Sequence, residues 1–396
     1  MNRHTMKRKS LPIVAKKLFQ ALEQIEYGKL NLTGPNGEKF VFGCGEPEVE
    51  FKFRDWGVFN ALAARGDIGL GETYVAGLWD CSSIDLLTQI AFKNEAVFEK
   101  NINGSFLNRL YLVLTNNFVR RNNRKGSRVN IKSHYDVGNE FYRLWLDKSM
   151  TYSSALYSSA EGDDTSDLEQ AQYQKYERLL NITKDSGNKL LEIGCGWGGF
   201  AEQAIAADRD LTAVTISEAQ QHYTQKRLGP KADIRLQDYR DITGKFDSII
   251  SIEMIEAVGE KYWPTYFKKL KECLAEGGRS VIQAIIVEDD HFPNYRRRSD
   301  YIRHYTFPGG MLLCPSKITQ TAKKVGLSSE NLYRFGQDYA KTLREWLKRF
   351  GEAEEDIRKL GYSEEFIRSW EFYLQVCAAA FTTGRTDVVH FELKHA

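Results

Sequence analysis

The sequence predicts an α/β protein in which a mostly parallel sheet carries helices on both faces, preceded by a smaller mixed α+β domain. Three observations support this fold class. An apolar run at residues 189–193 ends in a glycine cluster, and helical spacing follows it. Strand-like and helix-like segments then alternate as far as residue 287. The first 120 residues lack this alternation and are rich in aromatic side chains, which indicates a separate domain.

The predicted N-terminal domain covers residues 1–120. Apolar residues between positions 10 and 28 recur at helical spacing, whereas residues 29–55 alternate between apolar and polar in short runs. The turn residues Gly34-Pro35-Asn36-Gly37 separate the first two runs. Residues 56–116 return to helical spacing. We therefore expect a helix, then short strands, then further helices.

A polar and basic stretch at residues 121–133 separates the two predicted domains. Its composition is typical of a linker, or of a segment that lies on an acidic surface. Residues 134–396 form the second domain. Within that domain, residues 288–383 are predicted to be a helical and aromatic insertion, which begins with a long loop at residues 288–316.

The second domain begins with an aromatic, polar segment. A helix follows whose interior includes Leu168 and Leu180, and Asp163, Asp164 or Thr165 can serve as its N-cap. A later helix covers residues 218–227 and has Ser217 as its N-cap. Strands are predicted at residues 190–193, 211–216, 234–236, 246–252, 280–287 and 388–393.

The glycine cluster predicts a ligand-binding turn. Gly194, Gly196 and Gly198 let the chain turn sharply and approach a bound molecule closely. Their spacing fits the dinucleotide pattern Gly-x-Gly-x-x-Gly less well than Gly-x-Gly-x-Gly. A pyrophosphate needs N–H groups at a helix N-terminus, whereas S-adenosylmethionine has no phosphate and presents an amino group. Because Glu192 can complement that amino group, the turn favours S-adenosylmethionine.

Polar side chains also mark the ends of neighbouring predicted strands. Thr215 ends one strand, Asp238 and Tyr239 follow the next, and Glu253 and Glu256 follow a third. Ligands of open parallel sheets bind at the carboxyl ends of the strands. We therefore expect these side chains to surround the same site.

Composition excludes several classes of protein. The net charge of +2 gives no argument for nucleic acid. Basic clusters such as Arg296-Arg297-Arg298 are usually solvated faces, and a minority of such clusters mark an anionic surface such as phospholipid headgroups. The six cysteines are scattered without a Cys-x-x-Cys pair, which predicts a reducing compartment and no metal site. The sequence shows neither an apolar run long enough to span a bilayer nor a secretory signal.

Several motifs together carry a resemblance to a known family. They are Gly71-Glu72-x-Tyr74-x-x-Gly77-x-Trp79-Asp80, His134-Tyr135-Asp136-x-Gly138-Asn139-x-Phe141-Tyr142, Tyr152-Ser153, Leu191-Glu192-Ile193-Gly194-Cys195-Gly196-Trp197-Gly198, Thr215-x-Ser217-x-x-Gln220, Gln237-Asp238-Tyr239-Arg240-Asp241, Met254-x-Glu256-x-Val258-Gly259, Phe307-Pro308-Gly309-Gly310 and Tyr373-Leu374-x-x-Cys377-x-x-x-Phe381. With these motifs, the sequence resembles the cyclopropane-fatty-acyl-phospholipid synthases, which are related to the mycolic acid cyclopropane synthases.

The resemblance implies a fold and an activity. The fold is the class I S-adenosylmethionine-dependent methyltransferase fold, with a Rossmann-like, mostly parallel seven-stranded sheet and an N-terminal domain that engages lipid. The activity is transfer of a methylene group from S-adenosylmethionine to the cis double bond of an unsaturated phospholipid, through a carbocation that is then deprotonated. The resemblance also implies a homodimer, no nucleic-acid partner, and a cytoplasmic protein that is peripheral on the inner face of the membrane.

The resemblance assigns roles to individual residues. It places S-adenosylmethionine against Tyr152, Ser153, Glu192, Gly194, Cys195, Gly196, Trp197, Gly198, Thr215, Ile216, Ser217, Gln220, Asp238 and Tyr239. A bicarbonate ion, the base in this family, would be held by Ser154, Glu256, Gln283, Ile285 and Tyr373. Cys377 matches an active-site position, but the chemistry needs no nucleophile there.

This sequence departs from the family pattern around the base. Ser154 replaces a cysteine, Gln283 and Ala257 each replace a histidine, and Glu253 stands where glycine is common. Serine and glutamine can still donate hydrogen bonds to an anion, so bicarbonate fits. The alternative is that Glu256 or Glu253 acts directly on the cation. The departures also leave a methyl- or methylene-branched product open.

Two further readings come from other classes of protein. A small-molecule N- or O-methyltransferase would share the predicted core, but Glu72, Tyr74 and Trp79 in the N-terminal domain weigh against it. A catalytically silent binding protein is disfavoured by the intact glycine turn and by Glu256.

Overall fold

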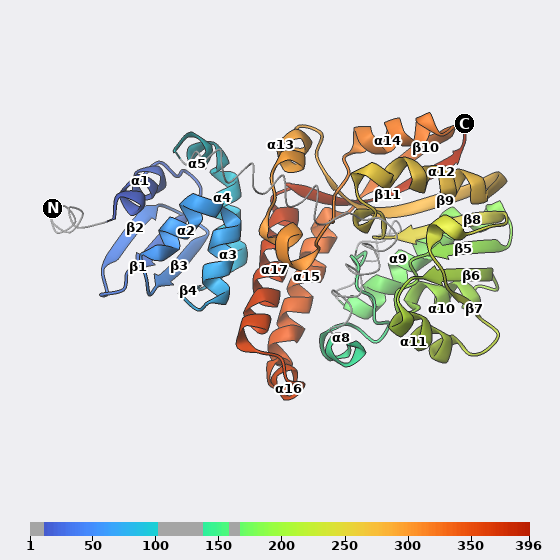
Figure 1. The fold of residues 1–396 in the computed structure, drawn as a ribbon, viewed down its shortest axis with the longest axis horizontal. Helices are drawn as coiled ribbons and strands as arrows, with labels where there is room; N and C mark the ends of the chain where they lie inside the picture. Colours follow the sequence, from blue (N-terminus) through green and yellow to red (C-terminus); the bar gives the residue numbers. More distant parts are fainter. Residues whose placement is uncertain (1–11, 102–137, 158–166) are drawn as a thin grey trace. The chain divides into compact units, whose positions relative to one another are not determined.

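The computed structural model describes residues 12–101, 138–157 and 167–396 (Figure 1). These residues form two compact units. Unit one contains the described part of residues 1–119 together with residues 298–306 and 354–385, and unit two contains the rest. The division differs from the predicted domains, because part of the 288–383 insertion belongs to unit one. The predicted linker at residues 121–133 lies outside the described residues.

Unit one contains a four-stranded mixed sheet in the order β2-β1-β3-β4. Strand β1 pairs antiparallel with β2 and parallel with β3, and the short strand β4 was not predicted. The elements of unit one are α1 (Ile13–Leu22), β1 (Lys29–Thr33), β2 (Lys39–Gly43), β3 (Glu48–Phe53), α2 (Gly57–Arg65), α3 (Asp67–Val75), β4 (Trp79–Cys81), α4 (Ile84–Lys93), α5 (Glu95–Asn101), α16 (Glu354–Lys359) and α17 (Glu364–Thr382).

Aromatic side chains form the core of unit one. Residues of β3 alternate between exposed and buried, as the sequence predicts for a half-buried strand. Trp79 is fully buried and stacks on Phe51 with their ring centroids 4.8 Å apart. Its indole N–H donates to the carbonyl oxygen of Leu70 over 3.0 Å. The ring therefore fills the core without leaving its polar atom unpaired.

Unit two contains a seven-stranded sheet in the order β10-β11-β9-β8-β5-β6-β7, the class I S-adenosylmethionine-dependent methyltransferase arrangement predicted from the sequence. Strands β9, β8, β5, β6 and β7 are parallel, and β11 and β10 complete the sheet antiparallel. The first elements of unit two are α8 (Asn139–Trp145), α9 (Leu168–Ile182), β5 (Lys189–Ile193), α10 (Gly199–Ala206), β6 (Asp210–Thr215), α11 (Glu218–Leu228), β7 (Asp233–Leu236) and β8 (Phe246–Ile252). The later ones are α12 (Trp263–Cys273), β9 (Leu274–Val287), α13 (Phe292–Arg297), α14 (Pro315–Lys324), β10 (Leu327–Arg334), α15 (Gly336–Glu352) and β11 (Thr386–His395).

Helices cover both faces of the sheet in unit two (Figure 1). Successive residues of one strand enter different cores: Leu190 of β5 packs with the core of α9 and α10, whereas Leu191 packs with the core of α12 and α14. Ile249 and Ile250 of β8 divide between the same two cores. The strands are therefore apolar on both faces, which is why they appear in the sequence as continuous apolar runs.

Some local predictions were wrong. Helix α9 has Asp167 as its N-cap, with the carboxylate accepting from the N–H of Glu169, whereas Asp163, Asp164 and Thr165 lie outside the described residues. The predicted loop at residues 288–316 contains α13 and the start of α14, and neither α14 nor β10 was predicted. The Ser217 cap is confirmed, because its Oγ accepts from the N–H of Gln220 over 3.3 Å.

Among the helices of the described ranges, none has both the length and the apolarity that a bilayer span requires.

The close approach of α2 and α3 makes a testable prediction at Gly69. A Cβ on Gly69 would overlap the backbone carbonyl of Ala61, which cannot move aside as a flexible side chain can. We expect Gly69→Ala to lower the free energy of unfolding of unit one by about 1–3 kcal/mol. The control is Gly351→Ala in α15, where nothing lies near the added methyl group and a small stabilisation is expected. Equal denaturant midpoints for both variants would contradict the prediction.

Candidate active site

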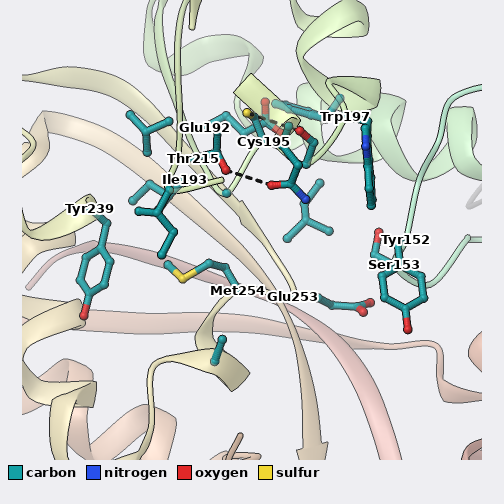
Figure 2. A pocket seen from close by; sticks show the side chains of 18 of the residues that line it. Tyr152, Ser153, Glu192, Ile193, Cys195, Trp197, Thr215, Tyr239, Glu253 and Met254 are labelled. Atoms are coloured by element: carbon teal, nitrogen blue, oxygen red, sulfur yellow. Dashed lines mark hydrogen bonds between the residues drawn. The ribbon is translucent and has the colours of Figure 1, made fainter. Parts of the chain in front are cut away.

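A cavity opens in unit two where strands β5, β6, β7 and β8 end (Figure 2). Its wall includes Gly194 after β5, Thr215 at the end of β6, Asp238 after β7 and Ile252 at the end of β8. Figure 2 shows Tyr152 and Trp197 along one side and Tyr239 on the opposite side. Parallel strands thus bring together side chains that are separated by as many as a hundred residues, as expected for this fold class.

The glycine turn leaves room for a ligand. Gly194 and Gly196 have φ values of 87° and 52°, in the left-handed region that favours glycine. A Cβ on Gly196 would meet no atom, so the space beside this backbone is open. Gly198 does not line the cavity; it is the N-cap of α10 and lies against Thr224. The turn therefore exposes backbone at Gly194 and Gly196 and packs at Gly198.

Hydrogen bonds fix the residues around the turn. The indole N–H of Trp197 donates to Oδ1 of Asn139 over 2.8 Å, which ties the turn to α8. The Thr224 hydroxyl donates to the carbonyl oxygen of Gly196 over 3.1 Å. The Thr215 hydroxyl donates to Oε1 of Gln220 over 2.9 Å, which leaves the amide N–H groups of Gln220 free to meet a ligand.

Glu192 supplies a buried acceptor to the cavity. The residue is 2% exposed, lines the cavity, and one carboxylate oxygen has no hydrogen-bond partner in the structure. Burial raises the pKa of Glu192 to about 8, and the positive charge of Lys175 opposes that rise. An unpaired buried acceptor is costly, and a cationic group bound in the cavity would satisfy it.

Asp238 and Tyr239 form the far end of the cavity. Asp238 is buried and its Oδ1 accepts from both the backbone N–H and Nε of Arg240, at 3.0 and 2.8 Å. This pairing fixes the carboxylate at the end of β7. The ring of Tyr239 meets Tyr266 edge to face, with centroids 5.5 Å apart.

Lys175 of α9 holds the segment that carries Tyr152 and Ser153. It is fully buried, and its ammonium donates to Oγ of Ser153, the carbonyl oxygen of Ser154 and Oε1 of Gln172, over 2.8, 2.9 and 2.6 Å. Burial lowers the pKa of Lys175 to about 7, whereas the carboxylate of Glu253 acts in the opposite direction. The lysine thus anchors one wall of the cavity.

Glu253 lines the cavity directly after β8 and accepts hydrogen bonds from separate parts of unit two. Its Oε1 accepts from the backbone N–H of Ser154 over 2.9 Å and from the amide of Gln283 over 2.7 Å. Its Oε2 accepts from the hydroxyl of Tyr339 over 2.7 Å. Figure 2 shows the carboxylate pointing towards the side of the cavity where Tyr152 lies.

Glu256 lies in the short turn Ile255–Ala257 and does not line this cavity. Its Oε1 accepts from the backbone N–H of Ile285 over 2.6 Å, and its other oxygen is buried without a partner. Burial raises the pKa of Glu256 to about 8, and the charge of Glu253 adds to the rise. The structure therefore pairs two of the predicted residues, Glu256 and Ile285, beside the cavity.

The structure gathers most of the predicted cofactor residues at this cavity. The exceptions are Gly198, and Ser217, whose side chain caps α11. Of the predicted base site, Ser154 and Gln283 donate to Glu253, and Ile285 donates to Glu256, all within unit two. Tyr373 and Cys377 belong to α17 in unit one, so their approach to the cavity stays a prediction. Burial raises the pKa of the Cys377 thiol, which disfavours a nucleophilic thiolate.

Sequence reasoning missed Lys175 and Tyr339. Lys175 lies seven residues after Leu168 and four before Leu179, on the helix face that those buried residues define. A lysine on the apolar face of a predicted helix was therefore a usable signal. Tyr339 gave no comparable signal, because α15 carries several aromatic residues at core spacing.

Known proteins resemble this chain in sequence. Residues 122–391 match the family model described as mycolic acid cyclopropane synthetase. Tuberculostearic acid methyltransferase of Mycobacterium tuberculosis is 34% identical over 364 residues, which cover 89% of this chain and 84% of that protein. Cyclopropane-fatty-acyl-phospholipid synthase of Escherichia coli is 33% identical over 344 residues, which cover 86% of each.

Solved structures agree in fold. The cyclopropane synthase MmaA2 from Mycobacterium tuberculosis has a TM-score of 0.60 and 26% identity, and covers 67% of this chain and 97% of its own. Mycolic acid cyclopropane synthase CmaA1, solved with SAH and CTAB, gives the same scores and coverage. Coclaurine N-methyltransferase has a TM-score of 0.61 over 82% of this chain and 98% of its own, but at 17% identity it shows the fold alone.

The buried Glu192 makes stability depend on pH. Its pKa is raised from 4.5 to about 8 in the folded protein, so the folded state favours the neutral carboxyl. The corresponding contribution to the free energy of unfolding is fully present below the unfolded pKa and is lost as pH rises through about 8. Glu192→Gln removes this loss. We expect the variant to be more stable than the wild type by roughly 2–4 kcal/mol at about pH 9, but not at about pH 5. Urea unfolding at both pH values measures the difference, with exposed Glu276→Gln as the control.

Proposed function

Because this chain belongs to the mycolic acid cyclopropane synthetase family, whose members include S-adenosylmethionine-dependent fatty acid methyltransferases and cyclopropane synthases, we propose a specific reaction for it. The protein transfers a one-carbon unit from S-adenosylmethionine to the cis double bond of an unsaturated acyl chain in a membrane phospholipid. The observation that carries the proposal is the cavity at the strand ends, where a glycine turn, a buried acceptor and aromatic walls meet.

The cavity fits S-adenosylmethionine. The unpaired oxygen of Glu192 suits the amino group, and the open space at Gly196 admits the ligand beside the backbone. The amide of Gln220, oriented by Thr215, adds donors at the end of β6. When bound, S-adenosylmethionine supplies a sulfonium methyl carbon that an electron-rich double bond can attack.

The aromatic walls suit a reaction that passes through a cation. Tyr152 and Trp197 lie on one side of the cavity and Tyr239 on the other (Figure 2). Aromatic faces stabilise positive charge, and a site that excludes water keeps the cation from being hydrated. The charge to be stabilised is that of the sulfonium and then that of the carbocation on the acyl chain, which must persist until it loses a proton.

The identity of the base separates two versions of the mechanism. A bicarbonate ion would need the donors of Ser154, Gln283 and Ile285. In this chain, the backbone N–H of Ser154 and the amide of Gln283 already pair with Glu253, and the N–H of Ile285 pairs with Glu256. We therefore favour a carboxylate of the protein over bicarbonate.

The product proposed is a cyclopropane, with a methyl- or methylene-branched chain as the alternative. The relatives divide in the same way, since one is named a cyclopropane-fatty-acyl-phospholipid synthase and another a tuberculostearic acid methyltransferase. We propose that the reaction takes place at the cytoplasmic surface of the membrane, with unit one engaging lipid.

Mass spectrometry of fatty acids tests the proposed function. We expect the purified protein, given S-adenosylmethionine and vesicles of monounsaturated phospholipid, to add one CH2 to the acyl chains. Resistance of the product to hydrogenation would support the cyclopropane, and a reducible product would support a methylene branch. Vesicles that bind the protein but gain no mass would contradict the proposal.

The Glu192→Gln variant also tests the cofactor site. A bound amino group favours the ionised form of Glu192, which glutamine cannot take, so we expect the Kd for S-adenosylhomocysteine to rise about 10-fold or more. Isothermal titration calorimetry measures this change, again beside Glu276→Gln. An unchanged Kd would exclude Glu192 from the amino-group site.

A further inference from the structure

We infer that Glu253 is the base that removes the proton from the carbocation formed on the acyl chain, so that this protein needs no external anion for the step. The inference rests on the proposed function and names a catalytic residue for it. It depends on the position of the Glu253 carboxylate at the cavity, on the donors that hold it, and on the backbone at residue 253.

The Glu253 carboxylate pairs with two of the groups that the family resemblance assigns to bicarbonate, at Ser154 and Gln283, and with Tyr339, which lies outside that set. Ser154 and Gln283 donate to Oε1, and Tyr339 donates to Oε2. Bicarbonate and a carboxylate present the same planar pair of oxygens. A side-chain carboxylate held by these donors can therefore perform the same proton abstraction without an ion having to bind first.

The direction of the Gln283 amide is fixed by a second buried residue. Nε2 of His390 lies 2.8 Å from Oε1 of Gln283, and His390 and Gln283 are both almost fully buried. Burial lowers the pKa of His390, so the ring is neutral and donates from Nε2. Because Oε1 of Gln283 accepts this bond, the amide N–H of Gln283 is directed to Glu253. His390 is thus a positioning residue.

Glu253 suits the role better than Glu256. Burial raises the pKa of Glu253, but the N–H of Ser154 and the charge of Lys175 oppose the rise and favour the carboxylate. Glu256 receives one backbone donor, and its pKa of about 8 keeps it largely protonated at neutral pH. Glu253 also lines the cavity, whereas Glu256 does not.

The backbone at Glu253 supports a functional reason for this residue. Its φ of 48° lies in the left-handed region, where a glutamate costs more than a glycine. Such strain persists at functional sites when the surroundings hold it in place. The three hydrogen bonds to the carboxylate hold it here.

The proposed step balances in atoms and charge. After the double bond has taken the methyl carbon, the acyl chain carries one positive charge. An oxygen of Glu253 takes a proton from the transferred methyl group, and the C–H electron pair becomes the C–C bond that closes the ring. Glu253 ends as the neutral acid, and the proton later passes to water.

Three proteins test the inference in buffers with and without bicarbonate: the wild type, Glu253→Gln and Glu253→Gly. We expect the wild type to be equally active in both buffers. Glu253→Gln keeps the shape without the base and should lose activity by about 100-fold or more. Glu253→Gly relieves the backbone and vacates the donors, so added bicarbonate should restore its activity at least about 10-fold above its level without bicarbonate.

Two controls keep the result unambiguous. Binding of S-adenosylhomocysteine by each variant shows that the cofactor site is intact, and Glu276→Gln reports any general effect of losing a carboxylate. A wild type that loses activity without bicarbonate, or a Glu253→Gln variant that keeps full activity, contradicts the assignment of Glu253 as the base. Either result leaves the proposed function standing. A wild type that forms no product from unsaturated vesicles contradicts the proposed function and this inference together.

Discussion

The hydrogen bonds to the carboxylate of Glu253 join parts of unit two that are far apart in the chain. They reach the segment at Ser154, the strand β9 at Gln283 and the helix α15 at Tyr339. A carboxylate that is largely removed from water is stabilised in its charged form when its oxygens accept hydrogen bonds, as those of Glu253 do. Each of the three segments must therefore be in place for these hydrogen bonds to form. The geometry of the cavity thus depends on the packing of the whole unit.

Lys175 performs a similar task on the other side of the same segment. Its ammonium holds Ser153 and Ser154 from α9, and α15 adds a bond from the N–H of Ala155 to the hydroxyl of Thr342. The segment has no regular secondary structure of its own, so side chains from two helices determine its shape. Protein cores usually exclude charged side chains. In unit two, a buried charged side chain, Lys175, lies beside the candidate site, where such exceptions are expected.

The sequence was most informative about the strands whose apolar runs are followed by glycines or by polar residues at the strand ends. Strands β5, β6, β7 and β8 and the glycine turn were predicted because apolar runs and glycines are local signals, and the polar residues at the strand ends indicated the edge of the sheet. Elements β10 and α14 were missed because α14 has few apolar residues and β10 is largely polar. The roles of Tyr339 and His390 depend on contacts across more than eighty residues of sequence, which no local pattern records. Lys175 did leave a local signal, as a lysine on the apolar face of a helix, but its partners could not be read from that signal.

The left-handed backbone at Glu253 has a consequence for how such enzymes can change. Codons for glutamate and glycine differ by one nucleotide, and the backbone at this position accepts glycine more readily than glutamate. A single point mutation could therefore exchange a resident base for a vacant anion site without refolding the chain. The dependence of the enzyme's activity on dissolved bicarbonate would then be gained or lost by one substitution at this position.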